Sequence, residues 1–236
     1  GATDAILNTG GVATVTVSGV ATAAQGGDID AFSKEVVFNV VDDAQDVIDE
    51  MTAHSEIASA QSITVSGVAN AAQGVTIDGF TKEVVFDVDS SADALATAIG
   101  GDSTLLDEAG SVTVTGGTVD ASDAAAIQGI SGYVDGTASS YDIVDSASAI
   151  VGATDAILNT GGVATVTVSG VATAAQGADI DAFSKDVVFN VVDDANDIAG
   201  ELSGLNDQLD EAVSVTVTGG TVNASDAAAI QGISGY

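Results

Sequence analysis

The stretch Val15-Thr16-Val17-Ser18-Gly19 alternates apolar and hydroxyl residues and then stops at glycine. This alternation predicts a short β-strand with one buried side and one solvent-facing side. The pattern returns four times along the chain, at Ile63–Gly67, Val112–Gly116, Val166–Gly170 and Val215–Gly219. The segment between two copies must bring the chain back to start the next strand. Because the strand pattern recurs in this way, the sequence predicts a repeat protein.

The spacing of the strands defines the repeat units. Their first apolar residues stand at positions 15, 63, 112, 166 and 215, and the eleven residues from Gly1 to Gly11 recur without change at Gly152 to Gly162. Three units therefore form one longer repeat of 151 residues. We expect one array, with units at approximately 1–61, 62–110, 111–164 and 165–213 and a partial unit at 214–236.

Each unit continues in the same order after its first strand. A short Ala-rich helix follows an N-cap residue such as Thr22 or Asn70, although the paired glycines at 26 and 27 predict a weak helix in the first unit. A second strand comes next, at 36–41, 84–88, 141–144 and 187–192, with an aromatic residue in the same register each time. A longer helix then begins, and the residues expected to cap it are Asp42, Ser90, Asp145 and Asp193.

This order of elements predicts an α/β fold. Parallel strands joined by helices make right-handed crossovers, and stacking them without reversal gives a right-handed repeat solenoid of β-α half-units with a parallel sheet. A leucine-rich-repeat-like arrangement fits best, with helices on the Val/Phe side of one sheet and Thr, Ser, Asn and Asp on its open side. The alternative is a two-sheet solenoid, in which each unit gives one strand to each sheet.

Composition narrows the classes of function. The chain has 236 residues and a formal charge of -32, and all but seven of its 35 acidic residues are aspartates. With three lysines and no arginine, neither nucleic acid nor an anionic membrane is expected as a partner, whereas divalent cations would be attracted. No apolar run is long enough for membrane insertion. Cysteine is absent and His54 is the single histidine, so thiol chemistry and Ser-His catalysis are excluded.

The strands and helix starts resemble those of a known class of protein. Val112-Thr-Val-Thr-Gly-Gly-Thr-Val-Asp-Ala-Ser-Asp-Ala-Ala-Ala-Ile127, followed by Tyr141-Asp-Ile-Val-Asp-Ser-Ala-Ser-Ala-Ile150, is similar to the repeats of giant bacterial and cyanobacterial cell-surface proteins of the adhesin or surface-layer type. In those repeats a Val-Thr-Val-Thr-Gly strand precedes a Ser-Asp-Thr-Ala-Ala-Asn-Leu-like helix start, which is degenerate here. The resemblance implies an extracellular or cell-surface location, and it implies no catalytic or binding residue.

Few residues point to specific chemistry. Paired aspartates at Asp28 and Asp30, and again at Asp179 and Asp181, lie near a glycine turn and are candidate calcium ligands, although they lack EF-hand spacing. Because the aspartates recur with the repeat, capping and solvation account for most of them, and no catalytic residue or cofactor is predicted. The third unit carries an insertion within residues 132–139, which is either a surface loop or a contact site.

These patterns predict a non-enzymatic structural segment of a long extracellular surface protein or filament, whose partners are neighbouring copies or further repeats of the same chain. The alternative is an adhesin-type binding module that recognises a glycan or a protein through the polar sheet face or the 132–139 loop. Exposed aromatic residues, which a glycan site usually needs, are limited to Tyr133 and Tyr236 in this reading.

Overall fold

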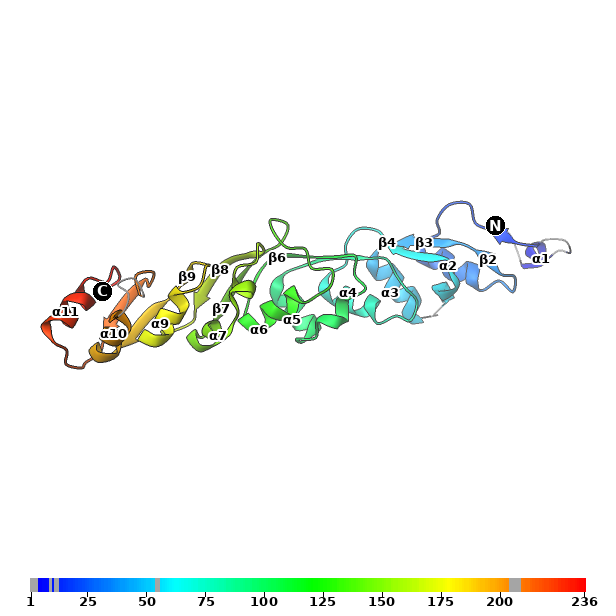
Figure 1. Ribbon diagram of the computed structural model, residues 1–236. Coiled ribbons are helices and arrows are strands. Elements are labelled where there is room, and N and C mark those ends of the chain that lie inside the picture. The colour runs from blue at the N-terminus through cyan, green and yellow to red at the C-terminus, as the bar shows by residue number, and fades with distance from the viewer. Residues whose placement is uncertain (1–3, 9, 11–12, 54–55, 204–208) are drawn as a thin grey trace. The chain divides into compact units, whose positions relative to one another are not determined.

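The computed structural model describes residues 4–8, 10, 13–53, 56–203 and 209–236 (Figure 1). The chain divides into two compact units. Unit 1 comprises residues 1–90, 97–113 and 129–134, and unit 2 comprises residues 91–96, 114–128 and 135–236. His54 and Leu205 lie outside the described residues.

Short strands and helices alternate in unit 1. Its elements are α1 (Asp4–Leu7), β1 (Val15–Thr16), α2 (Ala23–Asp30), β2 (Val36–Val37), β3 (Asn39–Asp42), α3 (Ala44–Ala53), η1 (Glu56–Ser59), β4 (Ser62–Val65), α4 (Ala71–Asp78), β5 (Asp87–Ser90) and η2 (Ser103–Leu106). Helix α5 (Ala92–Ile99) and strand β6 (Ser111–Val119) contribute residues to both units.

Unit 2 has the same alternation. Its elements are α6 (Ala121–Gln128), β7 (Ser140–Asp145), α7 (Ala147–Gly152), α8 (Asp155–Leu158), β8 (Val163–Val168), α9 (Ala174–Asp181), β9 (Val187–Val188), β10 (Asn190–Asp193), α10 (Ala195–Leu202), β11 (Ser214–Val217) and α11 (Ala224–Gln231). Helices α6, α7 and α9 lie along one side of strands β7, β8 and β9 (Figure 1).

The strands pair in parallel, and the predicted α/β class with parallel sheets is confirmed. In unit 1, β1 pairs with β2 and β3 pairs with β4. In unit 2, β7 pairs with β8, β8 pairs with β9, and β10 pairs with β11. The second strands of the first and fourth repeats are interrupted at Phe38 and at Phe189. The part before the aromatic residue pairs with β1 or β8, and the part after it pairs with β4 or β11 and also bridges Ala21 or Ala172.

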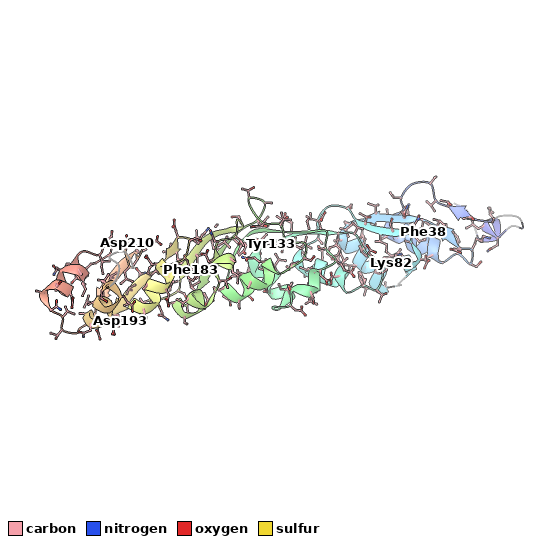
Figure 2. All side chains as sticks on the ribbon, viewed as in Figure 1. Phe38, Lys82, Tyr133, Phe183, Asp193 and Asp210 are labelled. Carbon is pink, nitrogen blue, oxygen red and sulfur yellow. The ribbon has the colours of Figure 1, made fainter. Side chains whose placement is uncertain are left out.

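The sides of the strands follow the predicted alternation. Val112, Val114 and Val166 are fully buried, whereas the intervening Thr113 and Thr167 are half-exposed. The aromatic residues of the second strands are the largest buried side chains of the core, and their common register predicted that they share the buried side. Phe38 (labelled in Figure 2), Phe86, Tyr141 and Phe189 are all at most 2% exposed.

The expectation of a weak helix at 26–27 is wrong. Helix α2 spans eight residues, and it begins with a capping box in which Thr22 and Gln25 bond each other's backbone N–H. A Cβ atom added to Gly26 would lie 2.6 Å from Ile57 Cγ2 and 2.9 Å from Val40 Cγ2. Gly26 therefore lets α2 approach the sheet closely, and packing outweighs its low helix propensity.

Candidate functional site

Aspartates at the ends of the second strands tie each strand to the preceding short helix. The carboxylate of Asp42 accepts the backbone N–H of Ala23, the first residue of α2, at 2.9 Å. In unit 2, Asp145 accepts the N–H of Ala121 at 3.1 Å, and Asp193 accepts the N–H of Ala174 at 3.0 Å. Because the first N–H groups of a helix have no partner within it, these carboxylates satisfy donors that would otherwise need water.

These three aspartates were expected to cap the following helix, and this prediction is wrong by one residue. The caps are Ser146 for α7 and Asp194 for α10, and in the first repeat Asp43 accepts the N–H of Asp46 in the first turn of α3. The last residue of each strand points toward the preceding helix instead. Asp193, at the end of β10, lies beside the helices (Figure 2).

The carboxylates of Asp42, Asp43 and Asp46 lie within 4.8 Å of one another, and no other group of three potential ligands is this close among the described residues. The negative charges of Asp43 and Asp42 raise the pKa of Asp46. The corresponding Asp197 in unit 2 has its pKa raised in the same way by Asp194 and Asp193. Since Asp42 and Asp43 already accept backbone N–H groups, the cluster is explained as a helix-capping arrangement.

The four candidate calcium ligands lie on the short helices. Asp28 and Asp179 are exposed, and Asp30 and Asp181 are half-exposed. Asp181 accepts the backbone N–H of Glu211 at 3.2 Å, and Asp78, its counterpart in the second repeat, accepts the N–H of Glu108 at 3.0 Å. Asp181 therefore has a structural role, because it binds the backbone of a later turn. Calcium binding by the four aspartates stays a prediction.

The part of the inserted loop that belongs to unit 2 is held in place. Asp135 accepts the N–H of Gly136 at 2.7 Å and that of Gly162 at 2.9 Å. Ser139, which is 2% exposed, accepts the N–H of Val114 at 3.1 Å. Tyr133 is half-buried, whereas Tyr236 is 59% exposed. The fixed backbone at 135–139 is that of a packed connection, which leaves contact with a partner as the untested alternative.

Hydroxyl groups connect neighbouring strands at a recurring position. Ser62 Oγ donates to Asn39 Oδ1 at 2.8 Å, and Thr165 Oγ1 donates to Asp142 Oδ1 at 2.6 Å. The same bond is made by Ser111 to Asp87 and by Ser214 to Asn190, each at 2.7 Å. Sequence reasoning placed the Asn and Asp residues on the polar side of the strands but did not identify these partners.

Two further contacts were not predicted. Gln128, at the end of α6, shares its side-chain N–H groups among Tyr141 Oη, Ile157 O and Thr160 Oγ1 at 2.7–3.0 Å. Lys82 Nζ donates to Ala60 O, and Lys185 Nζ donates to Val163 O, both at 2.7 Å (Lys82 is labelled in Figure 2). Each lysine is separated from its acceptor by 22 residues, and this identical spacing is the signal in the sequence that could have indicated the bond.

The contact between consecutive repeats is best seen in unit 2, where β7 and α7 pack on the next repeat. Ile143 pairs with Val166 and Asp145 with Val168, and the N–H of Ser169 donates to Asp145 O at 2.7 Å. Helix α7 lies against α9. This strand–helix segment, Ser140–Gly152, therefore covers both the edge of β8 and one flank of α9.

In unit 1 the residues that correspond to this covered surface form an open groove. Its volume is about 500 Å³, and it lies between α1, β1 and α2. The lining includes Leu7, Val15, Val17, Ile29, Phe32 and Val36. We call it the β1 groove.

Comparison with known proteins gives no assignment, because no family model, curated protein or solved structure matches the chain. Among the described residues, no helix is both long enough and apolar enough to cross a bilayer.

Proposed function

We propose that the chain is a non-enzymatic structural segment of a long extracellular surface protein or filament, folded as a right-handed α/β solenoid. The observation that carries this proposal is the return of the same hydrogen bonds at equivalent positions. The carboxylate bonds of Asp42 and Asp193 to the helix starts at Ala23 and Ala174 stand 151 residues apart, with the same sequence separation within each pair. Stacked repeats need the same contacts at equivalent positions, whereas an active site needs a group of residues that differs from those of the other repeats.

Strand pairing supports the one-sheet version of the solenoid. Strands β7, β8 and β9 are, in order, a second, a first and a second strand of the repeat, and they pair consecutively in one sheet. A two-sheet solenoid would put first and second strands in different sheets. The hydroxyl bond from Thr165 to Asp142 adds a side-chain link between two such strands.

The surface charge has a physical role in this proposal. A formal charge of -32 makes separate molecules repel one another, which keeps a long array soluble. Divalent cations would screen this charge, and acidic residues on successive repeats would gather them. The resemblance to giant surface proteins is the ground for the extracellular or cell-surface location.

A truncation series tests the solenoid. Truncated chains that end after successive units should lose stability by roughly constant steps, because each unit contacts only its neighbours. Small-angle scattering should give an elongated particle. A compact particle, or a single truncation that unfolds the whole chain, would contradict the proposal. Antibody labelling of intact source cells, before and after protease treatment, tests the location separately.

The adhesin alternative is favoured by apolar side chains on the outer sheet face. Val85 is 55% exposed and Val188 is 48% exposed, and they stand beside Thr64 and Thr167 as direct strand partners. A surface on which Thr and Val alternate would be better suited to contact a protein or a glycan than to face water alone. A binding screen with the chain, a Val85→Ser/Val188→Ser variant and a variant lacking residues 135–138 tests this. A ligand lost only in one of the two variants would establish a binding module.

A further inference from the structure

We propose that the β1 groove binds a strand–helix segment with the sequence pattern of Ser140–Gly152, supplied by a further repeat of the same protein. This inference rests on the proposed function as a repeat array, and it adds the sequence of the segment that would occupy the groove. It is supported by a comparison of two parts of the same chain. The groove occurs twice, 151 residues apart, and in the second occurrence its occupant is present.

Burial at matching positions gives the first evidence. Val15 and Ile29 are half-exposed in the groove, whereas their counterparts Val166 and Ile180 are 0% and 1% exposed. The amino-acid sequence around both pairs is nearly the same. The difference therefore reflects the segment that covers the second pair, which is β7 together with α7.

The strand edge gives the second evidence. Strand β1 spans two residues and pairs with β2, whereas its counterpart β8 spans six residues and pairs with both β7 and β9. A parallel strand with one described neighbour offers its other edge for addition of a further strand. Adding a β7-like strand would extend β1 to the length of β8.

The polar groups required of the occupant can also be read from the second copy. Thr165 donates its hydroxyl to Asp142, and Ser169 donates its N–H to the carbonyl of Asp145. The corresponding residues of unit 1 are Thr14 and Ser18, which stand on either side of Val15 and Val17 in the sequence and are both exposed. An occupant must therefore place a carboxylate or amide oxygen opposite Thr14, as Asp142 and Asn190 do in unit 2, and a backbone carbonyl opposite Ser18.

The apolar requirements are equally specific. Ile143 of β7 stands opposite Val166, so the groove needs a branched apolar side chain opposite Val15. Ala147 and Ile150 of α7, the helix that lies against α9, are 5% and 0% exposed, so the helical part needs a small residue followed three positions later by a large one. Tyr-Asp-Ile-Val-Asp-Ser-Ala-Ser-Ala-Ile, residues 141–150, meets all of these conditions.

A synthetic peptide of residues 138–153 tests the proposal with the chain 1–236. We expect saturable binding by fluorescence anisotropy, together with slower amide hydrogen exchange at Ser18, the residue whose counterpart donates to Asp145. The matched peptide carries Ile143→Asp and is expected not to bind, because a carboxylate would be buried opposite Val15. Absence of saturation up to millimolar peptide would overturn the proposal.

Variants of the chain locate the site. Val17→Asp places a carboxylate in the groove and should abolish binding, and circular dichroism reports whether the variant folds. Thr14→Val is milder and should weaken binding on the order of tenfold, as expected for the loss of one hydrogen bond to a charged group.

The control is Val217→Asp in β11. A β7-like strand could also pair with an edge of β11, so this variant tests whether the peptide binds there instead of in the groove. Binding that survives Val17→Asp, that is unchanged in Thr14→Val, or that is lost with Val217→Asp would contradict the assignment to the groove. Equal steps in the truncation series together with no peptide binding would leave the array standing and reject this inference alone.

Discussion

The carboxylate of Asp193 and the backbone N–H of Ala174 are joined by a hydrogen bond of 3.0 Å across 19 residues of chain. The other oxygen of the same carboxylate accepts the N–H of Asp194, the residue that caps α10. One side chain thus fixes the end of β10, the start of α9 and the approach to α10. The pair at Asp42 and Ala23 repeats the arrangement in unit 1 at 2.9 Å.

Removing this carboxylate should lower stability. We expect Asp193→Ala to cost about 1–3 kcal/mol of the free energy of unfolding, because two backbone donors lose their partner. Asp193→Asn keeps one acceptor oxygen and should cost less. Urea denaturation followed by circular dichroism measures both. Asp179→Ala, which removes an exposed aspartate from α9, serves as the control and should stay within about 0.5 kcal/mol of the parent. Equal losses for Asp179 and Asp193 would contradict this role.

Two helical glycines should respond in opposite directions to the same substitution. A Cβ on Gly177 would lie 2.8 Å from both Leu209 Cδ2 and Val191 Cγ2, so Gly177→Ala should destabilise by about 1–3 kcal/mol through overpacking. A Cβ on Gly200, in α10, meets no atom within 4 Å. Gly200→Ala should therefore stabilise by about 0.5–1 kcal/mol through its higher helix propensity. Thermal melts of the two variants side by side check the prediction, and a loss at Gly200 would refute it.

The sequence was informative where a pattern is local. Alternation of Val and Thr indicated which side of each first strand is buried, and the register of Phe38 with Phe189 located the core of the second strands. It failed where an outcome depends on a distance between separate elements. No residue adjacent to Asp42 indicates that its carboxylate accepts the backbone N–H of Ala23. The close packing that requires glycine at position 26 is against Ile57, which lies 31 positions later in the sequence.

The same reason explains the outcome at the candidate sites. The short spacing of Asp28 and Asp30 is visible in the sequence. The hydrogen bond from the N–H of Glu211 to Asp181, however, depends on where the chain after α10 is placed relative to α9. The β1 groove could not be recognised from residues 1–36 alone. It becomes apparent only when Val15 is compared with its covered counterpart Val166.

The Asp155–Ser184 pair should govern one carboxylate titration. The hydroxyl and the backbone N–H of Ser184 both donate to Asp155 and lower its pKa. A carboxyl group with a lower pKa in the folded state contributes stability that is present above its unfolded pKa of about 3.9 and is lost as pH falls through the folded value. Ser184→Ala should move the pKa of Asp155 up toward its ordinary value, and the stabilities of variant and parent should converge in acid.

Carbon-detected NMR titration of the Asp155 carboxyl group measures this change directly. Ser203→Ala is the control, because the Ser203 hydroxyl donates to Gly200 O, so the pKa of Asp155 should not change in that variant. An unaltered Asp155 titration in Ser184→Ala would show that the hydroxyl bond does not hold the pKa down.

Calcium should stabilise the chain mainly by screening its charge. The carboxylates of Asp42 and Asp43 already accept backbone N–H groups, and repulsion from both raises the pKa of Asp46, so any cation nearby relieves the same repulsion. Equal concentrations of calcium and magnesium, at matched ionic strength, should then raise the melting temperature equally. A calcium-specific rise that disappears in a variant with Asn at the four candidate ligands would contradict this and establish a built site. Those four are Asp28, Asp30, Asp179 and Asp181.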